Sequence, residues 1–120
     1  MAHTYIEARQ EAERRVVTQF IELALQHGFT LHSVSDGEER HKTTTLEQAL
    51  EHVFSVDESW IYFTPPPTSP SPVRHCIYIV LGNEGWDAIA DHSLGQHGRT
   101  GDPWTTVTEA HDAWLDEEYP

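Results

Sequence analysis

The sequence is poor in the residues that build disulfides, zinc sites and membrane spans. It contains one cysteine, Cys76, which excludes an intramolecular disulfide and a cysteine-based structural zinc site. No apolar run approaches the roughly 18 residues that a membrane helix needs, and the first ten residues are polar rather than signal-like. A Gly-rich phosphate loop and a Gly-x-Ser-x-Gly turn are both missing. We therefore expect one soluble, cytoplasmic domain over residues 1–120, with no membrane contact, no metal and no cofactor.

Basic residues are also scarce. Seven Lys and Arg residues stand against 20 Asp and Glu residues, and the net charge is −13 with histidine neutral. The imbalance grows along the chain, because residues 43–120 hold thirteen acidic residues and only Arg74 and Arg99 as bases. Such a chain repels nucleic-acid phosphates and anionic lipid and favours a basic partner. An excess of negative charge also keeps small proteins soluble, so charge alone leaves both interpretations open.

Helical periodicity predicts three helices, over residues 4–27, 44–54 and 102–115. Gly28 follows the first helix as its expected left-handed end residue. Thr44 precedes Glu47 by three residues, a capping-box pattern at the start of the second helix. Asp102 and Pro103 fit the N-cap and the first turn of the third. The acidic tail over 116–120 opposes the helix dipole and is expected to fray.

Apolar, aromatic and β-branched residues, partly in alternation, predict strands at residues 29–35, 40–43, 59–64, 73–81 and 86–92. Asp36-Gly37 suits a tight hairpin turn, and five prolines make residues 65–72 a stiff loop. The segment 73–81 is apolar on both faces, which favours the centre of the sheet. The element order is then α-β-β-α-β-β-β-α. The fold class is α+β, an antiparallel sheet of about four to five strands with helices packed on one face.

Three short motifs combine turn residues with acids: Val34-Ser-Asp36-Gly37-Glu38-Glu39, Phe54-x-x-Asp57-Glu58 and Leu81-Gly82-Asn83-x-Gly85-x-Asp87-x-Ile89-x-Asp91. This pattern resembles a group of small phage- and plasmid-borne proteins with no established activity. The resemblance spans roughly residues 15–95, and the proline run and the C-terminal tail do not belong to it. It implies a mobile-element accessory protein in a bacterial host cell, and it assigns no functional residue.

Acidic side chains in the turns, in the last predicted strand and in the last helix are the candidate partner-binding residues: Asp36, Glu38, Glu39, Asp57, Glu58, Glu84, Asp87, Asp91, Asp112, Asp116 and Glu117. We expect them to present an acidic surface to a basic host protein, such as a nuclease or another nucleic-acid-binding defence protein. The chain would then be a non-enzymatic inhibitor of anti-CRISPR or anti-restriction type that mimics nucleic acid. Nucleic acid itself is not an expected ligand, and no catalytic residue is assigned.

A homodimeric accessory protein is the first alternative. It would pair through exposed aromatic side chains such as Trp60, Trp104 and Trp114, and its association would tolerate salt. The nine histidines also allow a pH response, because nine added positive charges would move the net charge from −13 to −4. Any partner contact that depends on the negative charge of the chain would therefore weaken as the pH falls through about 6.5.

A small metal-dependent enzyme is the second alternative, with a site drawn from Asp87, Asp91, His92 and His97. On one strand the first two would stand about 13 Å apart, too far for one ion without a bulge. Cys76 has no cooperating base, because the side chain of neighbouring His75 points to the opposite face of its strand.

Overall fold

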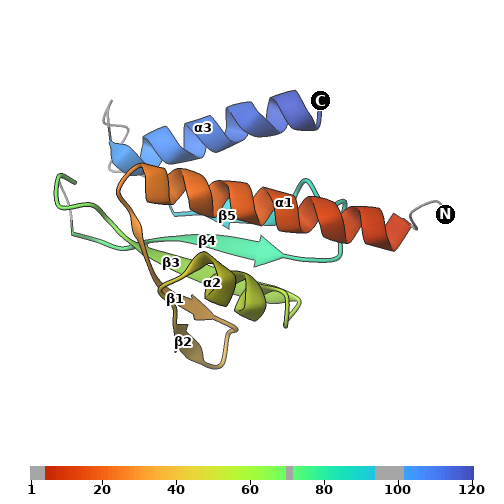
Figure 1. The fold of residues 1–120 in the computed structure, drawn as a ribbon, viewed down its shortest axis with the longest axis horizontal. Coiled ribbons are helices and arrows are strands. Elements are labelled where there is room, and N and C mark those ends of the chain that lie inside the picture. Colours follow the sequence, from red (N-terminus) through yellow and green to blue (C-terminus); the bar gives the residue numbers. More distant parts are fainter. Residues whose placement is uncertain (1–4, 70–71, 94–101) are drawn as a thin grey trace.

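The computed structural model describes residues 5–69, 72–93 and 102–120, which form three helices and five strands (Figure 1). The elements are α1 (Tyr5–Gln26), β1 (Thr30–Ser35), β2 (Arg40–Lys42), α2 (Leu46–Val53), β3 (Glu58–Thr64), β4 (His75–Val80), β5 (Ile89–His92) and α3 (Pro103–Glu118). The strands form one antiparallel sheet in the order β2-β1-β3-β4-β5. The predicted α+β class and element order are confirmed. None of the described helices is long and apolar enough to cross a membrane.

Antiparallel pairing brings three connections to one end of the sheet. Strands β1 and β4 finish at this end, and β2, β3 and β5 start there. The register places Ser35 opposite Arg40 and Glu58 opposite Val80. The β1–β2 turn, the α2–β3 connection and the β4–β5 connection therefore lie side by side, although they are far apart in sequence.

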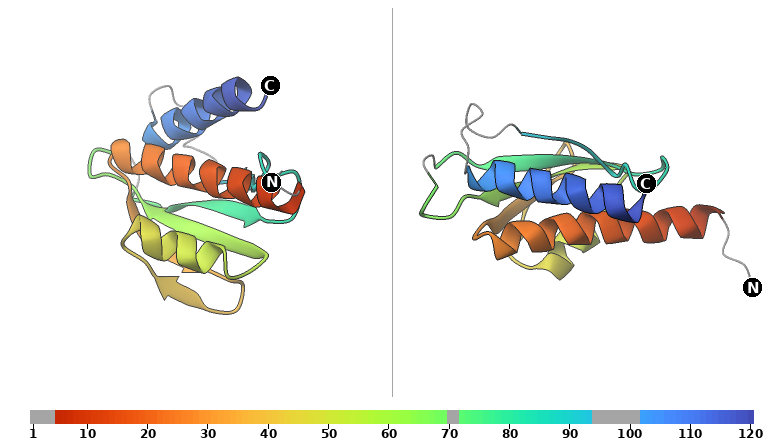
Figure 2. Two further views of the ribbon diagram at one scale, coloured as in Figure 1. Left: turned by 45° about the vertical axis from the view of Figure 1, so that its right-hand side comes forward. Right: turned by 90° about the horizontal axis from the view of Figure 1, so that it is seen from above.

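All three helices cover the same face of the sheet, so the molecule has one helical layer and one strand layer (Figure 2). Alternate strand residues point into the space between the layers, where Ile61, Phe63, Ile77 and Ile79 are fully buried. Phe20 of α1 packs against the ring of Trp104 from α3, with their centroids 5.6 Å apart. Burial of these apolar side chains is the main favourable term for folding.

Local chemistry explains where α2 and α3 begin. The hydroxyl of Thr45 accepts the backbone N–H of Gln48 (3.2 Å), so Thr45 rather than the predicted Thr44 is the N-cap of α2. The Gln48 side chain reaches back to the N–H of Thr44 (3.0 Å), which completes a box one residue later than expected. Asp102 caps α3 and Pro103 opens it, as predicted.

The last strand and the sheet centre differ from the prediction. Strand β5 begins at Ile89, not at residue 86, because the carboxylate of Asp87 holds the preceding residues in a turn. The interior position in the middle of the sheet belongs to β3, with β4 next to it. Alternation in residues 86–92 had suggested a longer strand, but the side chain of Asp87 satisfies the backbone locally and ends the ladder.

Helix α3 also runs further than predicted. It continues to Glu118 instead of ending near Leu115 and fraying. The guanidinium of Arg15 pairs with the carboxylate of Glu118 at 2.8 Å and lies 5.5 Å from the ring centre of Trp114. These contacts from α1 hold the last turn, which intrinsic helix preference alone would leave loose.

Two histidines are buried between the layers. His111 contacts the side-chain oxygen of Gln19 through Nδ1 and the ring of Phe20 at 5.0 Å, and its Nε2 has no hydrogen-bond partner in the described part of the chain. His75 shares a hydrogen bond with the hydroxyl of Ser93 (2.9 Å). Burial lowers the pKa of both histidines, that of His111 to about 4. Both rings are therefore neutral at pH 7.

Candidate functional site: the acidic end of the sheet

The three connections at one end of the sheet carry most of the acids predicted to bind a partner. Seven of the eleven lie on these connections or at the first residue of β3: Asp36, Glu38, Glu39, Asp57, Glu58, Glu84 and Asp87. We call this region the acidic end. Strand directions create it: β1 and β4 run toward this end, β2, β3 and β5 run away from it, and α2 carries the chain back between β2 and β3.

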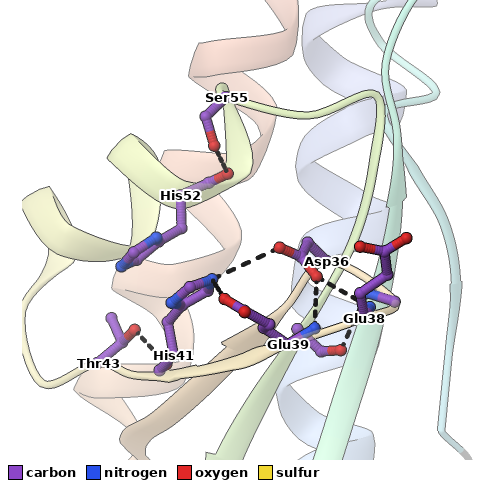
Figure 3. A network of polar contacts seen from close by, with 9 residues as sticks. Asp36, Glu38, Glu39, His41, Thr43, His52 and Ser55 are labelled. Carbon is purple, nitrogen blue, oxygen red and sulfur yellow. Dashed lines mark hydrogen bonds and ion pairs between the residues drawn. The ribbon is translucent and has the colours of Figure 1, made fainter.

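The β1–β2 turn is fixed by its own aspartate. One carboxylate oxygen of Asp36 accepts the backbone N–H groups of Glu38 (2.9 Å) and Glu39 (2.7 Å), as Figure 3 shows. These two hydrogen bonds lower the pKa of Asp36, so this group stays charged at neutral pH. Gly37 has a φ of 95°, a left-handed conformation that glycine adopts without strain. The turn is rigid, and the carboxylates of Glu38 and Glu39 remain exposed.

Two histidines sit beside this turn. The Nε2 of His41 lies 3.5 Å from a carboxylate oxygen of Asp36 and 3.9 Å from one of Glu39. The His41 ring stacks on that of His52 from α2, with centroids 4.4 Å apart (Figure 3). His52 is itself in the last turn of α2, where its carbonyl accepts the hydroxyl of Ser55 (2.7 Å). The stacking of His41 on His52 joins the β1–β2 hairpin to α2 and sets the position of the turn.

The α2–β3 connection contributes Asp57 and Glu58, both exposed. The backbone carbonyl of Asp57 accepts the N–H of Leu81 (2.9 Å), which ties this connection to the end of β4. Glu58 accepts the hydroxyl of Tyr78 (2.7 Å) and raises the pKa of that tyrosine. A shallow depression at this point is lined by Asp36, Asp57 and Glu58 together with Val80 and Leu81.

The β4–β5 connection is held by a second aspartate and by a buried glutamate. Asp87 accepts the N–H groups of Glu84 (3.1 Å) and Gly85 (3.2 Å). Glu13 of α1, only 2% exposed, accepts the N–H of Gly82 (2.7 Å). This hydrogen bond satisfies a buried carboxylate oxygen and anchors the connection to the helical layer.

Two exposed aromatic residues stand among these acids. Trp86 is 49% exposed and lies between Glu84 and Asp87 in the sequence, and Tyr5 is 66% exposed at the start of α1. The hydroxyl of Tyr5 donates to the carboxylate of Glu84 (3.2 Å). Sequence patterning had placed Trp86 on a strand face and gave Tyr5 only a helical role. The signal that was missed is Asp87, whose side chain converts this segment into a turn and turns Trp86 outward.

The other predicted acids lie elsewhere. Asp91 of β5 is opposite Tyr78 on the uncovered face of the sheet. Asp112, Asp116 and Glu117 are exposed on α3, in the helical layer. These four acids do not belong to the group formed by the connections.

The structure also places the residues of the two alternative functions, the aromatic homodimer and the metal-dependent enzyme. Trp104 is fully buried in the core, so it is wrong as an exposed dimer contact, and Trp60 and Trp114 are only partly exposed. The carboxylate of Asp87 is used within its turn, and His97 lies outside the described residues. Among the described residues, no group of three or more His, Cys, Asp and Glu side chains is arranged to hold a metal ion.

Cys76 and its neighbour His75 point to opposite faces of β4, as their alternation required. His75 is buried under the helices, and Cys76 is partly exposed on the other side. Burial raises the pKa of the Cys76 thiol, which lowers its nucleophilicity at neutral pH.

Comparison of the chain with protein-family models, with curated proteins and with solved structures finds no match.

Proposed function

We propose that this chain is a non-enzymatic interaction module whose acidic end binds a basic protein. The observation that carries the proposal is that seven acids from three connections share one end of the sheet, with exposed Trp86 and Tyr5 beside Glu84 and Asp87 at the β4–β5 connection. An exposed aromatic anchor within a charged rim is the usual make-up of a protein-binding site.

The geometry of the site also lowers the entropic cost of binding. Asp36 and Asp87 each fix their own turn through two backbone hydrogen bonds, and Glu13 anchors the β4–β5 connection to α1. A surface that is ordered before binding loses less conformational freedom when the partner arrives. Glu38, Glu39 and Glu84 are exposed glutamates of these ordered turns, and their carboxylates would contact the partner.

The partner class that we favour is a nucleic-acid-binding protein of a bacterial host, such as a nuclease. Its basic groove normally receives phosphates, and closely placed carboxylates offer charge of the same sign. The net charge of −13 and the resemblance to phage- and plasmid-borne proteins support this assignment. The chain would act as an inhibitor of host defence, of anti-CRISPR or anti-restriction type.

Capture from a bacterial host lysate tests the proposal with matched variants. The tagged wild-type chain is compared with the triple variant Glu38→Gln/Glu39→Gln/Glu84→Gln and with Asp112→Asn/Asp116→Asn/Glu117→Gln, which removes three charges from α3. We expect the wild type and the α3 variant to recover the same basic protein at low salt, and the acidic-end variant to lose it. Mass spectrometry identifies the protein, and competition with its nucleic acid tests inhibition.

The affinity of the purified pair gives a second test. Binding should weaken steeply with added salt, because opposite charges across an exposed contact are screened. Trp86→Ala should weaken it by about thirtyfold, the effect of a typical hot-spot residue. Equal capture by both triple variants contradicts the proposal. Salt-tolerant self-association with no captured partner would instead support the homodimeric accessory protein.

A further inference from the structure

The face of the sheet turned away from the helices collects basic side chains in a chain that has few of them. Lys42 lies opposite Ser33, Ser33 opposite Tyr62, and Tyr62 opposite Cys76, so these residues form one row across four strands. Arg74 comes two residues before Cys76, just outside β4, and its charge acts on His32 together with those of Lys42 and Arg40. The row therefore has Lys42 at one end and Arg74 two residues beyond its other end along the chain.

A third cation lies over the middle of this row. The guanidinium carbon of Arg40 is 4.2 Å from the ring centre of Tyr62. Such a stacked arginine is held in place while its N–H groups stay available to an acceptor. We call the surface formed by Arg40, Lys42, Arg74 and Tyr62 the outer basic face.

These cations have no acidic partners. Among the described residues, no carboxylate lies within ion-pair distance of Arg40, Lys42 or Arg74, although the chain has 20 acidic residues. Arg15 of the helical layer, by contrast, pairs with Glu118 at 2.8 Å. Gathering like charges without ion pairs is unfavourable, and only Arg40 has a packing contact that holds it, the ring of Tyr62.

His32 lies within the positive field of these cations. Burial lowers its pKa, and the charges of Arg74, Arg40 and Lys42 lower it further. All three cations therefore act on one point of the sheet, and the field that favours neutral His32 attracts an anion.

The remaining groups on this face restrict which anion fits. The rings of Trp60 and Tyr78 stack on each other with centroids 4.9 Å apart, and Arg40 covers Tyr62, so few aromatic planes are free to stack on bases. Glu58 and Asp91 bring negative charge to the same face. A long polyanion would meet these acids, whereas a short segment would not. We propose that the outer basic face binds a short, extended, acidic polypeptide segment of another protein.

The spacing of the cations defines that segment. Lys42 on β2 and Arg74 beside β4 are separated by three strand-to-strand steps, about 14 Å, and by two residues along the strand direction, about 7 Å, which makes about 16 Å in all. An extended chain covers about 13 Å in four residues, and the long side chains span the rest, so two glutamates in a Glu-x-x-x-Glu spacing reach both cations. A third glutamate at the middle position would face Arg40.

Fluorescence anisotropy with a labelled peptide tests this assignment. The probe carries three glutamates at alternating positions separated by serine, and a control peptide carries glutamine in their place. The wild-type chain should bind the first and not the second. Lys42→Gln/Arg74→Gln should weaken binding about five- to tenfold, the effect of two exposed charge pairs. Arg14→Gln/Arg15→Gln removes the same charge from the helical layer and should leave the affinity unchanged.

Three results would overturn the proposal. The first is equal binding of the peptide by Lys42→Gln/Arg74→Gln and Arg14→Gln/Arg15→Gln, both folded by circular dichroism, or no binding of the peptide by the wild-type chain. The second is tighter binding of oligothymidylate, lost in Lys42→Gln/Arg74→Gln, which would make the face a nucleic-acid surface. The third is a wild-type dimer in sedimentation that the same variant dissociates, which would make the occupant a second copy. The acidic-end variant should bind the peptide normally, so the failure of one proposal is separable from that of the other.

Discussion

His111 is a titratable side chain in a position where its charged form would lose its hydration. It is 4% exposed and touches Gln19, Phe20 and Trp114, while the charge of nearby His92 also disfavours protonation. Its pKa is about 4 in the folded chain, against about 6.5 for a histidine in the unfolded chain. Between these two values the unfolded state binds more protons, so folding should weaken as the pH falls.

We expect the free energy of unfolding to keep the whole contribution of His111 above pH 6.5. Between pH 6.5 and pH 4 it should decrease by up to about 3 kcal/mol because of this residue. Urea denaturation across that pH range measures it. His111→Leu removes the titrating group and should flatten the curve over this interval, whereas His27→Gln at an exposed position should not. Parallel curves for all three proteins would contradict the assignment.

Two glycines at the β4–β5 connection offer a matched comparison of backbone conformation and space. Both have positive φ, 100° at Gly82 and 103° at Gly85. A Cβ on Gly82 would meet nothing within 4 Å, but one on Gly85 would lie 2.9 Å from the Cβ of Ala12 and 3.0 Å from the carbonyl oxygen of Arg9. Gly82→Ala thus carries the conformational cost alone, and Gly85→Ala adds a clash with the backbone of α1.

We expect Gly82→Ala to lower the free energy of unfolding by about 1 kcal/mol and Gly85→Ala by about 2–3 kcal/mol. Chemical denaturation of the two variants gives the difference directly. Equal losses would mean that α1 shifts away from the connection at little cost.

At the scale of elements, the sequence prediction and the structure differ in which threonine is the N-cap of α2. Both Thr44 and Thr45 precede the helix, and the spacing to Glu47 had favoured the first. The structure assigns the cap to Thr45, whose hydroxyl accepts the N–H of Gln48. Thr45→Ala should lower the free energy of unfolding by about 1 kcal/mol, and Thr44→Ala by a few tenths. The reverse order in thermal denaturation would restore the predicted cap.

The periodicity of the chain predicted the elements well because burial dictates it. Segments 59–64 and 73–81 are rich in apolar and β-branched residues, and the structure has strands there with one face packed on the helices and one turned away. The boundaries that failed depended on hydrogen bonds or ion pairs of single side chains. Asp87 ended the strand ladder early, and Arg15 extended α3 by pairing with Glu118. Neither contact leaves a periodic signal.

The candidate site was predictable in part. Turn chemistry marked Asp36, Glu38 and Asp57 as acids in connections, and their charge suggested a basic partner. Sequence alone did not show that the connections meet, since this depends on the strand order β2-β1-β3-β4-β5. For the same reason the sequence did not predict the outer basic face, because Lys42 and Arg74 come to the same face only through the pairing of β2 and β4 with β1 and β3.

For the whole molecule, the net charge of −13 should oppose the compact state. Raising sodium chloride from about 10 mM to about 300 mM screens this repulsion and should increase the free energy of unfolding by about 1 kcal/mol. The α3 variant Asp112→Asn/Asp116→Asn/Glu117→Gln carries three fewer charges and should gain less from salt. A stability that is independent of salt would show that the acids are too widely spaced to repel.

Since its three connections are distant in sequence, the acidic end exists only while the sheet is paired. A peptide copied from any single connection would not reproduce it, and the unfolded chain would have no affinity for the partner. By thermodynamic linkage, a partner that binds there acts as a folding ligand, adding about 2.7 kcal/mol of stability when present at 100 times its dissociation constant. Inside a cell, partner and chain would thus protect one another, and a chain without its partner would be exposed sooner to proteolysis.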